Sequence, residues 1–359
     1  MATIYDVARE SGYSPTVVSH ALNNNPRVSE KARAAVLVAA KRLHYRPNLL
    51  ARELGLNKTK LIGIIVRDII YPFYPSIVEG IEETAFSHGY TTILCNSAGS
   101  IEREAIYLDV LTRRKAAGII VGPVQSGPDN TVLFQELKES GVPIVFVDGN
   151  LKRVKTDFIL TDGVKGAYKA VRHLVELGHN RIGCVEPASG EPNRLAGYRK
   201  ALEDSHIDFR EEYVARRKGD RGDQGKIGNE VDGYEGTRQL LQLRYPPTAI
   251  FAINDVMAFG AEKAIREFGL RIPADISLVG FDDVLFSSFL GVPLTTVKQP
   301  THAIGRTAAT ILISRIEQQG RQKRRRHISI EPDLVVREST GPAPRKARRR
   351  AQGSRYPSS

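Results

Sequence analysis

After residue 60, short apolar runs alternate with longer amphipathic segments, and this alternation constrains the fold more than any other feature of the chain. The apolar runs are continuous, as strands buried on both faces of a parallel sheet require. The candidate strands are residues 61–66, 90–95, 118–121, 143–148, 181–186, 249–253 and 276–281. The amphipathic segments 75–88, 164–177 and 256–268 are each followed by a glycine suited to a helix C-terminus, namely Gly89, Gly178 and Gly269. The pattern predicts two successive α/β lobes.

The first sixty residues predict a small all-helical unit instead. Thr3 and Asp6 have the spacing of a capping box at the start of a first helix. Ser14 is suited to cap a second helix that begins at Pro15, where a missing N–H costs nothing. A third helix follows the cap Ser29 and runs to about residue 43. Three short helices in this order predict a helix-turn-helix with a supporting helix.

The second of these helices has two distinct faces. Its apolar side is formed by Val17, Val18, Ala21 and Leu22. Its other side leaves four residues at or near the outside, namely Pro15, Thr16, Ser19 and His20. Thr16 and His20 stand one turn apart, so both can reach neighbouring bases, and a histidine offers a donor or an acceptor to a base edge. An exposed helix histidine without a DNA role is the alternative interpretation of His20.

A short segment follows at residues 47–60. Pro47 ends the preceding element, Asn48 can cap a helix over residues 49–54, and Gly55 can terminate it. A helix of about two turns is marginal by itself in water. We therefore expect this hinge to form helix only when something binds it.

The net charge of +12 is concentrated at the two ends of the chain. Residues 1–60 carry ten Lys or Arg and four acids, and residues 341–359 carry six bases and no acid, so residues 61–340 are neutral. This division predicts that the two basic ends of the chain bind a polyanion. The tail 341–359 has little to bury and is predicted to be disordered. Residues 215–233 predict a long surface loop, and the run RQKRRR at 321–326 is either a solvated loop or a basic patch.

Several classes of protein are disfavoured. No run of about 18 apolar residues occurs, and the first residues carry an acid, so we expect a cytoplasmic protein. Cys95 and Cys184 lack metal-ligand spacing and are interpreted as buried hydrophobes; no metal or other cofactor is expected. Asp282 and Asp283 would point oppositely on a strand and cannot act as an acid/base pair, and no nucleophile triad or P-loop is present, which disfavours an enzyme.

The order of motifs resembles the lactose-repressor (LacI/GalR) family of bacterial transcription regulators. The shared motifs are T-I-x-D-V-A, S-P-T-V-V-S-H-A-L-N and Y-R-P-N-x-x-A-R-x-L before L-I-G-I-I-V, and later R-L-A-G-Y, S-L-V-G-F-D-D and L-T-T-V-K-Q-P. The resemblance extends from residue 2 to about residue 338. It implies a helix-turn-helix headpiece (1–46), a hinge (47–60) and a two-lobed periplasmic-binding-protein-like body with parallel sheets (61–340), followed by the tail.

The resemblance also implies which residues bind DNA. The second helix would lie in the major groove of a near-palindromic operator and the hinge in the minor groove, with Leu54 as a wedge at the central base step. The implied DNA-binding residues are Pro15, Thr16, Ser19, His20, Asn48, Ala51 and Leu54. Leu54 packing within its own domain is the alternative interpretation.

For the body, the resemblance implies a small ligand between the lobes, most simply a sugar or sugar derivative. The implied effector-binding residues are Phe73, Tyr74, Asp148, Arg194, Asn254, Asp282 and Gln299. Carboxylate, amide, guanidinium and aromatic groups are the mixture that a polyol needs. The sequence thus predicts a homodimeric, ligand-controlled repressor. An effector-independent DNA-binding or architectural protein, which would use the body only to dimerise, is the alternative.

Overall fold

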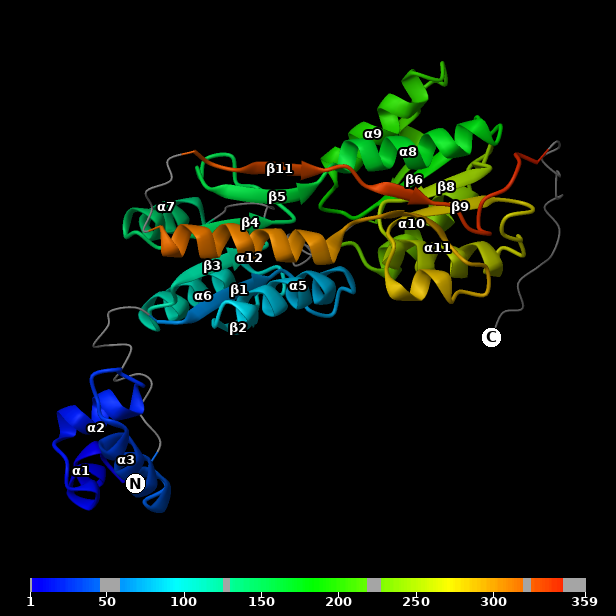
Figure 1. The fold of residues 1–359 in the computed structure, drawn as a ribbon. Coiled ribbons are helices and arrows are strands. Elements are labelled where there is room, and N and C mark those ends of the chain that lie inside the picture. The colour runs from blue at the N-terminus through cyan, green and yellow to red at the C-terminus, as the bar shows by residue number, and fades with distance from the viewer. Residues whose placement is uncertain (1, 46–58, 125–129, 218–226, 319–323, 345–359) are drawn as a thin grey trace, which may run out of the picture. The chain divides into compact units, whose positions relative to one another are not determined.

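The structure is a computed structural model that describes residues 2–45, 59–124, 130–217, 227–318 and 324–344 (Figure 1). It separates into two compact units, Met1–Lys60 and Leu61–Ser359. We call the first unit the headpiece and the second the body. No helix among the described residues is both long and apolar enough to cross a membrane.

The described residues of the headpiece form three helices. They are α1 (Ile4–Ser11), α2 (Pro15–Leu22) and α3 (Glu30–Arg42). The predicted caps are confirmed, because Thr3 and Asp6 form the reciprocal capping box and Ser14 and Ser29 each accept a backbone N–H through their side chains. Val7, Val18 and Val36, one from each helix, are fully buried in a shared core. The sequence therefore fixes this unit through local caps and one small apolar cluster.

The first lobe of the body is built on a six-stranded sheet of order β11-β5-β4-β3-β1-β2 in which every pair is parallel. Its strands are β1 (Leu61–Val66), β2 (Thr91–Asn96), β3 (Gly118–Val121), β4 (Ile144–Val147), β5 (Asp157–Thr161) and β11 (His327–Ile330). Its helices are α5 (Phe73–Ser87), α6 (Ile101–Arg113), α7 (Thr131–Glu139) and α12 (Thr301–Glu317). Two apolar clusters pack on the sheet.

The second lobe has a six-stranded sheet of order β12-β10-β9-β8-β6-β7, parallel except for the β10–β12 pair. Its strands are β6 (Ile182–Glu186), β7 (Val214–Arg216), β8 (Ala249–Ala252), β9 (Ser277–Asp282), β10 (Thr295–Lys298) and β12 (Asp333–Val335). Its helices are α8 (Gly163–Glu176), α9 (Pro192–Glu203), α10 (Glu230–Leu241) and α11 (Asp255–Glu267), with 3-10 turns η1 (Glu211–Tyr213) and η3 (Leu285–Ser288). The predicted fold class is confirmed.

The two lobes are not successive in the sequence, and the prediction is wrong in this respect. After β5 the chain enters the second lobe at α8, returns to the first lobe at α12, and crosses again between β11 and β12. The orange helix α12 lies in the first lobe with α5, β3 and β4 (Figure 1). Gly80 and Gly305 permit this packing, because a Cβ on either would lie within 2.3 Å of a backbone oxygen of the other helix. Periodicity identifies a helix but not the sheet that it covers.

Two predicted boundaries need correction. Residues 215–233 are not one loop, because β7 includes residues 215 and 216 and α10 begins at Glu230, where Asn229 and Asp232 form a capping box. The described start of the tail, residues 341–344, is docked and not disordered, since the Gly341 N–H donates to Ser277 Oγ at 3.0 Å and the Ala343 N–H donates to the Leu177 carbonyl at 2.8 Å. Local composition gave no sign of these contacts.

The predicted burial of the strands holds for the central strands and fails at an edge. β3, β4, β6, β8 and β9 are buried along their whole length, whereas β2 at the sheet edge is largely accessible. Both cysteines are buried and free, as predicted. Gly89, Gly178 and Gly269 have φ of 73°, 89° and 69°, the left-handed conformation that ends a helix.

Candidate DNA-reading helix and effector site

The helix α2 presents the predicted side chains outward. Val18 and Ala21 form its fully buried side. On the other side Thr16 and His20 are exposed, and Pro15 and Ser19 are half-buried. Its amino terminus is held because Ser14 Oγ accepts the Val17 N–H at 3.3 Å. The result is a short, capped helix whose polar side chains point away from the headpiece core.

The segment after α2 is fixed by an arginine of α3. Arg33 donates to Asn24 Oδ1 and to the Asn25 carbonyl, each at 2.8 Å. This arginine therefore has a structural role, whereas Arg27 and Lys31 are exposed. The predicted minor-groove residues Asn48, Ala51 and Leu54 lie outside the described residues.

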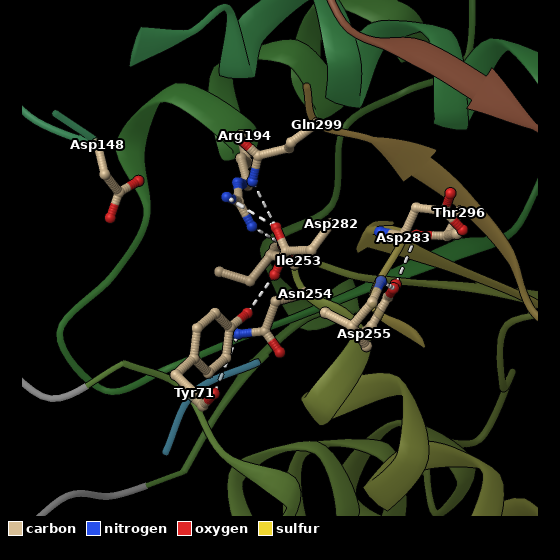
Figure 2. Close-up of polar contacts among 12 residues, drawn as sticks. Tyr71, Asp148, Arg194, Ile253, Asn254, Asp255, Asp282, Asp283, Thr296 and Gln299 are labelled. Carbon is tan, nitrogen blue, oxygen red and sulfur yellow. Dashed lines mark hydrogen bonds and ion pairs between the residues drawn. The ribbon is translucent and has the colours of Figure 1, made fainter. Parts of the chain in front are cut away.

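The body brings three of the predicted effector residues together at the ends of second-lobe elements. Arg194, in the first turn of α9, lies 3.3 Å from Asp282 Oδ1 at the end of β9. Gln299, on the segment that crosses to the first lobe, donates to the same oxygen at 2.6 Å. The guanidinium also donates to the Ile253 carbonyl and lies 3.9 Å above the Phe281 ring centre. Figure 2 shows these side chains converging on the Asp282 carboxylate.

A residue that sequence analysis missed joins this group from the other lobe. Tyr71, which follows β1 and packs in the first-lobe core, donates its hydroxyl to Asp282 Oδ2 (Figure 2). The contact connects the two lobes directly at the candidate site. The signal in the sequence was an aromatic residue just after a strand carboxyl end, which is where open α/β sheets bind ligands.

Burial dominates the electrostatics of Asp282. It raises the pKa of this carboxyl from 3.8 to about 7, even though Arg194 and the hydrogen bonds from Tyr71 and Gln299 act in the opposite direction. Burial opposes the charge on Arg194, but the neighbouring Asp282 and Glu191 carboxylates outweigh it and raise the pKa of the guanidinium. The site therefore combines a permanent cation with a carboxyl that can change protonation near neutral pH.

The other predicted first-lobe residues form a second group. The Tyr74 hydroxyl donates to Asp148 Oδ2 at 2.7 Å, and Phe73 packs edge-on against the Tyr74 ring at 5.2 Å between ring centres. Phe73 and Tyr74 are buried core residues, and their contact with an effector stays a prediction. Figure 2 shows Asp148 apart from the Arg194–Asp282 group.

Two charged residues that sequence analysis did not single out connect these groups electrostatically. The charge of Arg67 lowers the pKa of both Tyr74 and Glu191, against the larger effect of burial, and the charge of Glu191 in turn raises the pKa of Arg194. Burial raises the pKa of Glu191. Arg67 directly follows β1 and Glu191 directly precedes α9. Single charged residues in such connecting segments form no periodic pattern, so the sequence contains no signal for either.

Asn254 has a structural role in this arrangement. Its Oδ1 caps α11 by accepting the Met257 N–H at 2.7 Å, and its Nδ2 donates to the Gly228 carbonyl at 3.0 Å. Both ends of the amide therefore have partners in this structure, and an effector contact by Asn254 stays a prediction. The sequence leaves open whether Arg221 contacts an acidic ligand or points into solvent, and this residue lies outside the described residues.

The adjacent carboxylates Asp282 and Asp283 diverge, as expected. Asp283 Oδ1 accepts from Arg337 at 2.6 Å and lies away from the Arg194 group. Asp148, Asp282 and Asp283 all have positive φ, at 56°, 126° and 55°. Non-glycine residues held in this conformation often mark functional sites. Among the described residues no cluster of His, Cys, Asp or Glu is arranged to hold a metal ion.

Comparison with known proteins places this architecture in a family. Residues 3–48 match the bacterial regulatory proteins of the lacI family, and residues 171–340 match a periplasmic binding protein-like domain. The chain is 37% identical over 355 residues to the HTH-type transcriptional repressor PurR of Yersinia pestis (strain Pestoides F), which covers 98% of this chain and 100% of that protein. The chain belongs to the lacI family.

Solved structures of lacI-type regulators have the same fold. The lac repressor dimer bound to operator and the anti-inducer ONPF matches with a TM-score of 0.81 and 30% identity, over 95% of this chain and 99% of that one. The transcriptional regulator CelR in complex with cellobiose matches with a TM-score of 0.69 and 28% identity, over 94% and 100%. These lacI-family relatives are named as regulators of transcription and not as enzymes.

Proposed function

We propose that the chain is a cytoplasmic, homodimeric repressor whose affinity for a near-palindromic operator is set by a small ligand bound between the lobes. The observation that carries the proposal is the Tyr71–Asp282 hydrogen bond, because it joins the lobes at the same carboxylate that holds Arg194 and Gln299. A ligand that competes for this carboxylate would change the contact between lobes. Its differential affinity for the two arrangements would then shift the population that binds DNA.

On the DNA side, Thr16 and His20 would read base edges in the major groove, with Pro15 and Ser19 contributing closer van der Waals contact. Asn48, Ala51 and Leu54 would enter the minor groove as a hinge helix formed by two subunits together. The exposed lysines and arginines of the headpiece would fix the register on the phosphates.

For the ligand, we propose a purine-like base first and the sugar predicted from sequence second. Arginine reads the O6 and N7 acceptors of a 6-oxopurine such as guanine with two parallel hydrogen bonds, and a neighbouring carboxylate accepts a ring or amino N–H. Arg194 and Asp282 offer this pair of groups on one site. The relative at 37% identity is named PurR, whereas the relative with cellobiose bound is 28% identical.

The experiment combines DNA selection with calorimetry on the full-length protein. Fragments enriched from a random pool should contain a near-palindrome, and titration with purine bases and with mono- and disaccharides should identify one class that binds. A ligand present at 100 times its Kd should raise the free energy of unfolding by about 2.7 kcal/mol. It should also change the Kd for the selected operator.

A matched pair of variants tests the site. Asp282→Asn should weaken binding of the ligand, whereas Asp283→Asn should leave it unchanged, because Asp283 contacts Arg337 instead. If the protein selects an operator but no ligand of either class alters stability or DNA affinity, the effector-independent alternative is correct. If no sequence is enriched, the repressor function itself is wrong.

A further inference from the structure

The first lobe carries a group of exposed cations that neither the headpiece nor the effector site uses. They lie just before two neighbouring strands, β5 and β11, and we call them the basic end. Its members are Lys152, Arg153, Lys155, Arg324, Arg325 and Arg326, all of which are exposed.

Parallel pairing places these cations side by side. β5 and β11 are parallel neighbours, with Phe158 opposite His327. The residues that precede the two strands therefore lie at the same end of the sheet, where its strands begin. Adjacent strands are about 4.8 Å apart. In Figure 1 the arrowheads of β5 and β11 point toward the second lobe, and their entry ends therefore face away from it.

The backbone beneath the basic end is held in place. Asp157 accepts from Arg315 Nε and Nη2, each at 2.8 Å, and from the Arg326 N–H at 2.7 Å. Arg315 also donates to the Arg324 carbonyl at 2.7 Å. The hydrogen bonds that Arg315 donates to Asp157, together with the charge of that carboxylate, raise the pKa of the Arg315 guanidinium. One buried ion pair with no net charge thus anchors both segments and leaves their cationic side chains outside.

The six cations lack carboxylate partners within the described part of the chain. In segments 149–157 and 324–327 the one acid is Asp157, and Arg315 already neutralises it. Since residues 61–340 have no net charge, this positive end is a local segregation of charge. Unpaired, clustered cations on one face are the electrostatic footprint of a polyanion site.

Chain connectivity indicates which polyanion. Lys60 precedes β1, so the polypeptide from the headpiece enters the body at the entry end of the same parallel sheet. The end of the first-lobe sheet at which the strands begin is therefore the end connected to the headpiece by the chain. A duplex bound by the headpiece supplies phosphates at high effective concentration to that end of the sheet.

We propose that the basic end of the first lobe contacts the phosphate backbone of duplex DNA beside the operator. This inference rests on the proposed DNA-binding function. The contact adds affinity and salt dependence without sequence specificity, because phosphates carry no base information. It also makes DNA affinity depend on how the first lobe is held, in addition to the hinge.

The test compares two duplexes and two triple variants of the full chain. One duplex is the selected operator alone, and the other extends it on each side by two helical turns, about 20 base pairs. The test variant carries Lys152→Ala, Lys155→Ala and Arg325→Ala. The control variant removes the same charge from the second lobe with Lys200→Ala, Arg244→Ala and Lys263→Ala, all at exposed positions.

On the long duplex, the slope of log affinity against log salt should fall by about 0.9 for each phosphate that the variant no longer neutralises, up to about 2.7 for the test variant. Over a fourfold change in salt this is up to about 40-fold in affinity. On the short duplex the test variant should match wild type, and the control variant should match wild type on both.

Equal slopes for wild type and test variant on the long duplex, with operator selection intact, would overturn this inference and leave the repressor function standing. A slope change on both duplexes, or one shared by the control variant, would assign the effect to net charge and also overturn it. A wild-type protein that selects no DNA would refute both proposals together.

Discussion

Replacing the buried carboxyl of Asp282 with an amide should change how stability depends on pH. Burial holds the pKa of Asp282 at about 7 in the folded chain, compared with 3.8 when exposed. The folded state therefore binds this proton more tightly than the unfolded state, and the free energy of unfolding falls as pH rises from about 4 to about 7. At about 1.4 kcal/mol per pH unit, the full effect is about 4 kcal/mol, of which about 3 kcal/mol falls between pH 5 and pH 8.

Asp282→Asn removes this titration while keeping the shape of the side chain. Its Oδ1 can still accept from Tyr71 or Gln299. Burial also raises the pKa values of Glu191 and Asp255. Wild type and Asp282→Asn both contain these two residues, so the difference between the pH profiles of the two proteins reports on Asp282. Wild type should lose about 3 kcal/mol more than the variant between pH 5 and pH 8.

The assay is urea unfolding without DNA or ligand at several pH values, followed by far-ultraviolet circular dichroism because the chain has no tryptophan. Wild-type midpoints should fall with rising pH more steeply than those of Asp282→Asn. Asp283→Asn serves as the control, since Arg337 binds that carboxylate at the other side of the strand end. Parallel pH profiles for wild type and Asp282→Asn would show that Arg194 keeps the carboxylate ionised and would refute the reasoning.

Three further substitutions test the remaining parts of the proposed function. His20→Ala should cost about 1 to 3 kcal/mol on the selected operator and much less on random DNA in equilibrium binding, whereas equal losses on both would mean that His20 reads no base. Arg194→Lys keeps the charge beside Asp282 but loses the planar fork, so calorimetry should show a ligand Kd at least about tenfold weaker with unchanged operator binding; an unchanged Kd would remove Arg194 from the site. Leu54→Ala should reduce operator bending measured by energy transfer between end labels, and a fully bent complex would contradict the wedge.

Local chemistry was sufficient to predict the headpiece. Thr3, Ser14 and Ser29 cap helices through contacts to residues three positions away, and Gly89 ends a helix through its own φ. Such interactions span one helical turn, so they are legible in a short stretch of sequence. The continuous apolar runs likewise predicted the central strands, because a strand buried on both faces has no polar face to show.

Only the tertiary structure decided how these elements combine at the site. Tyr71 and Asp282 are 211 positions apart, and no periodicity relates them. The Asn254 amide caps α11 and donates to the Gly228 carbonyl, which lies 26 positions away in the sequence. The three crossings between lobes bring α12 and β11 back to the first sheet, and with β11 they bring the cations of the basic end beside β5. Sequence patterns report which faces a segment buries, whereas the partners of those faces follow from chain topology and the packing of distant segments.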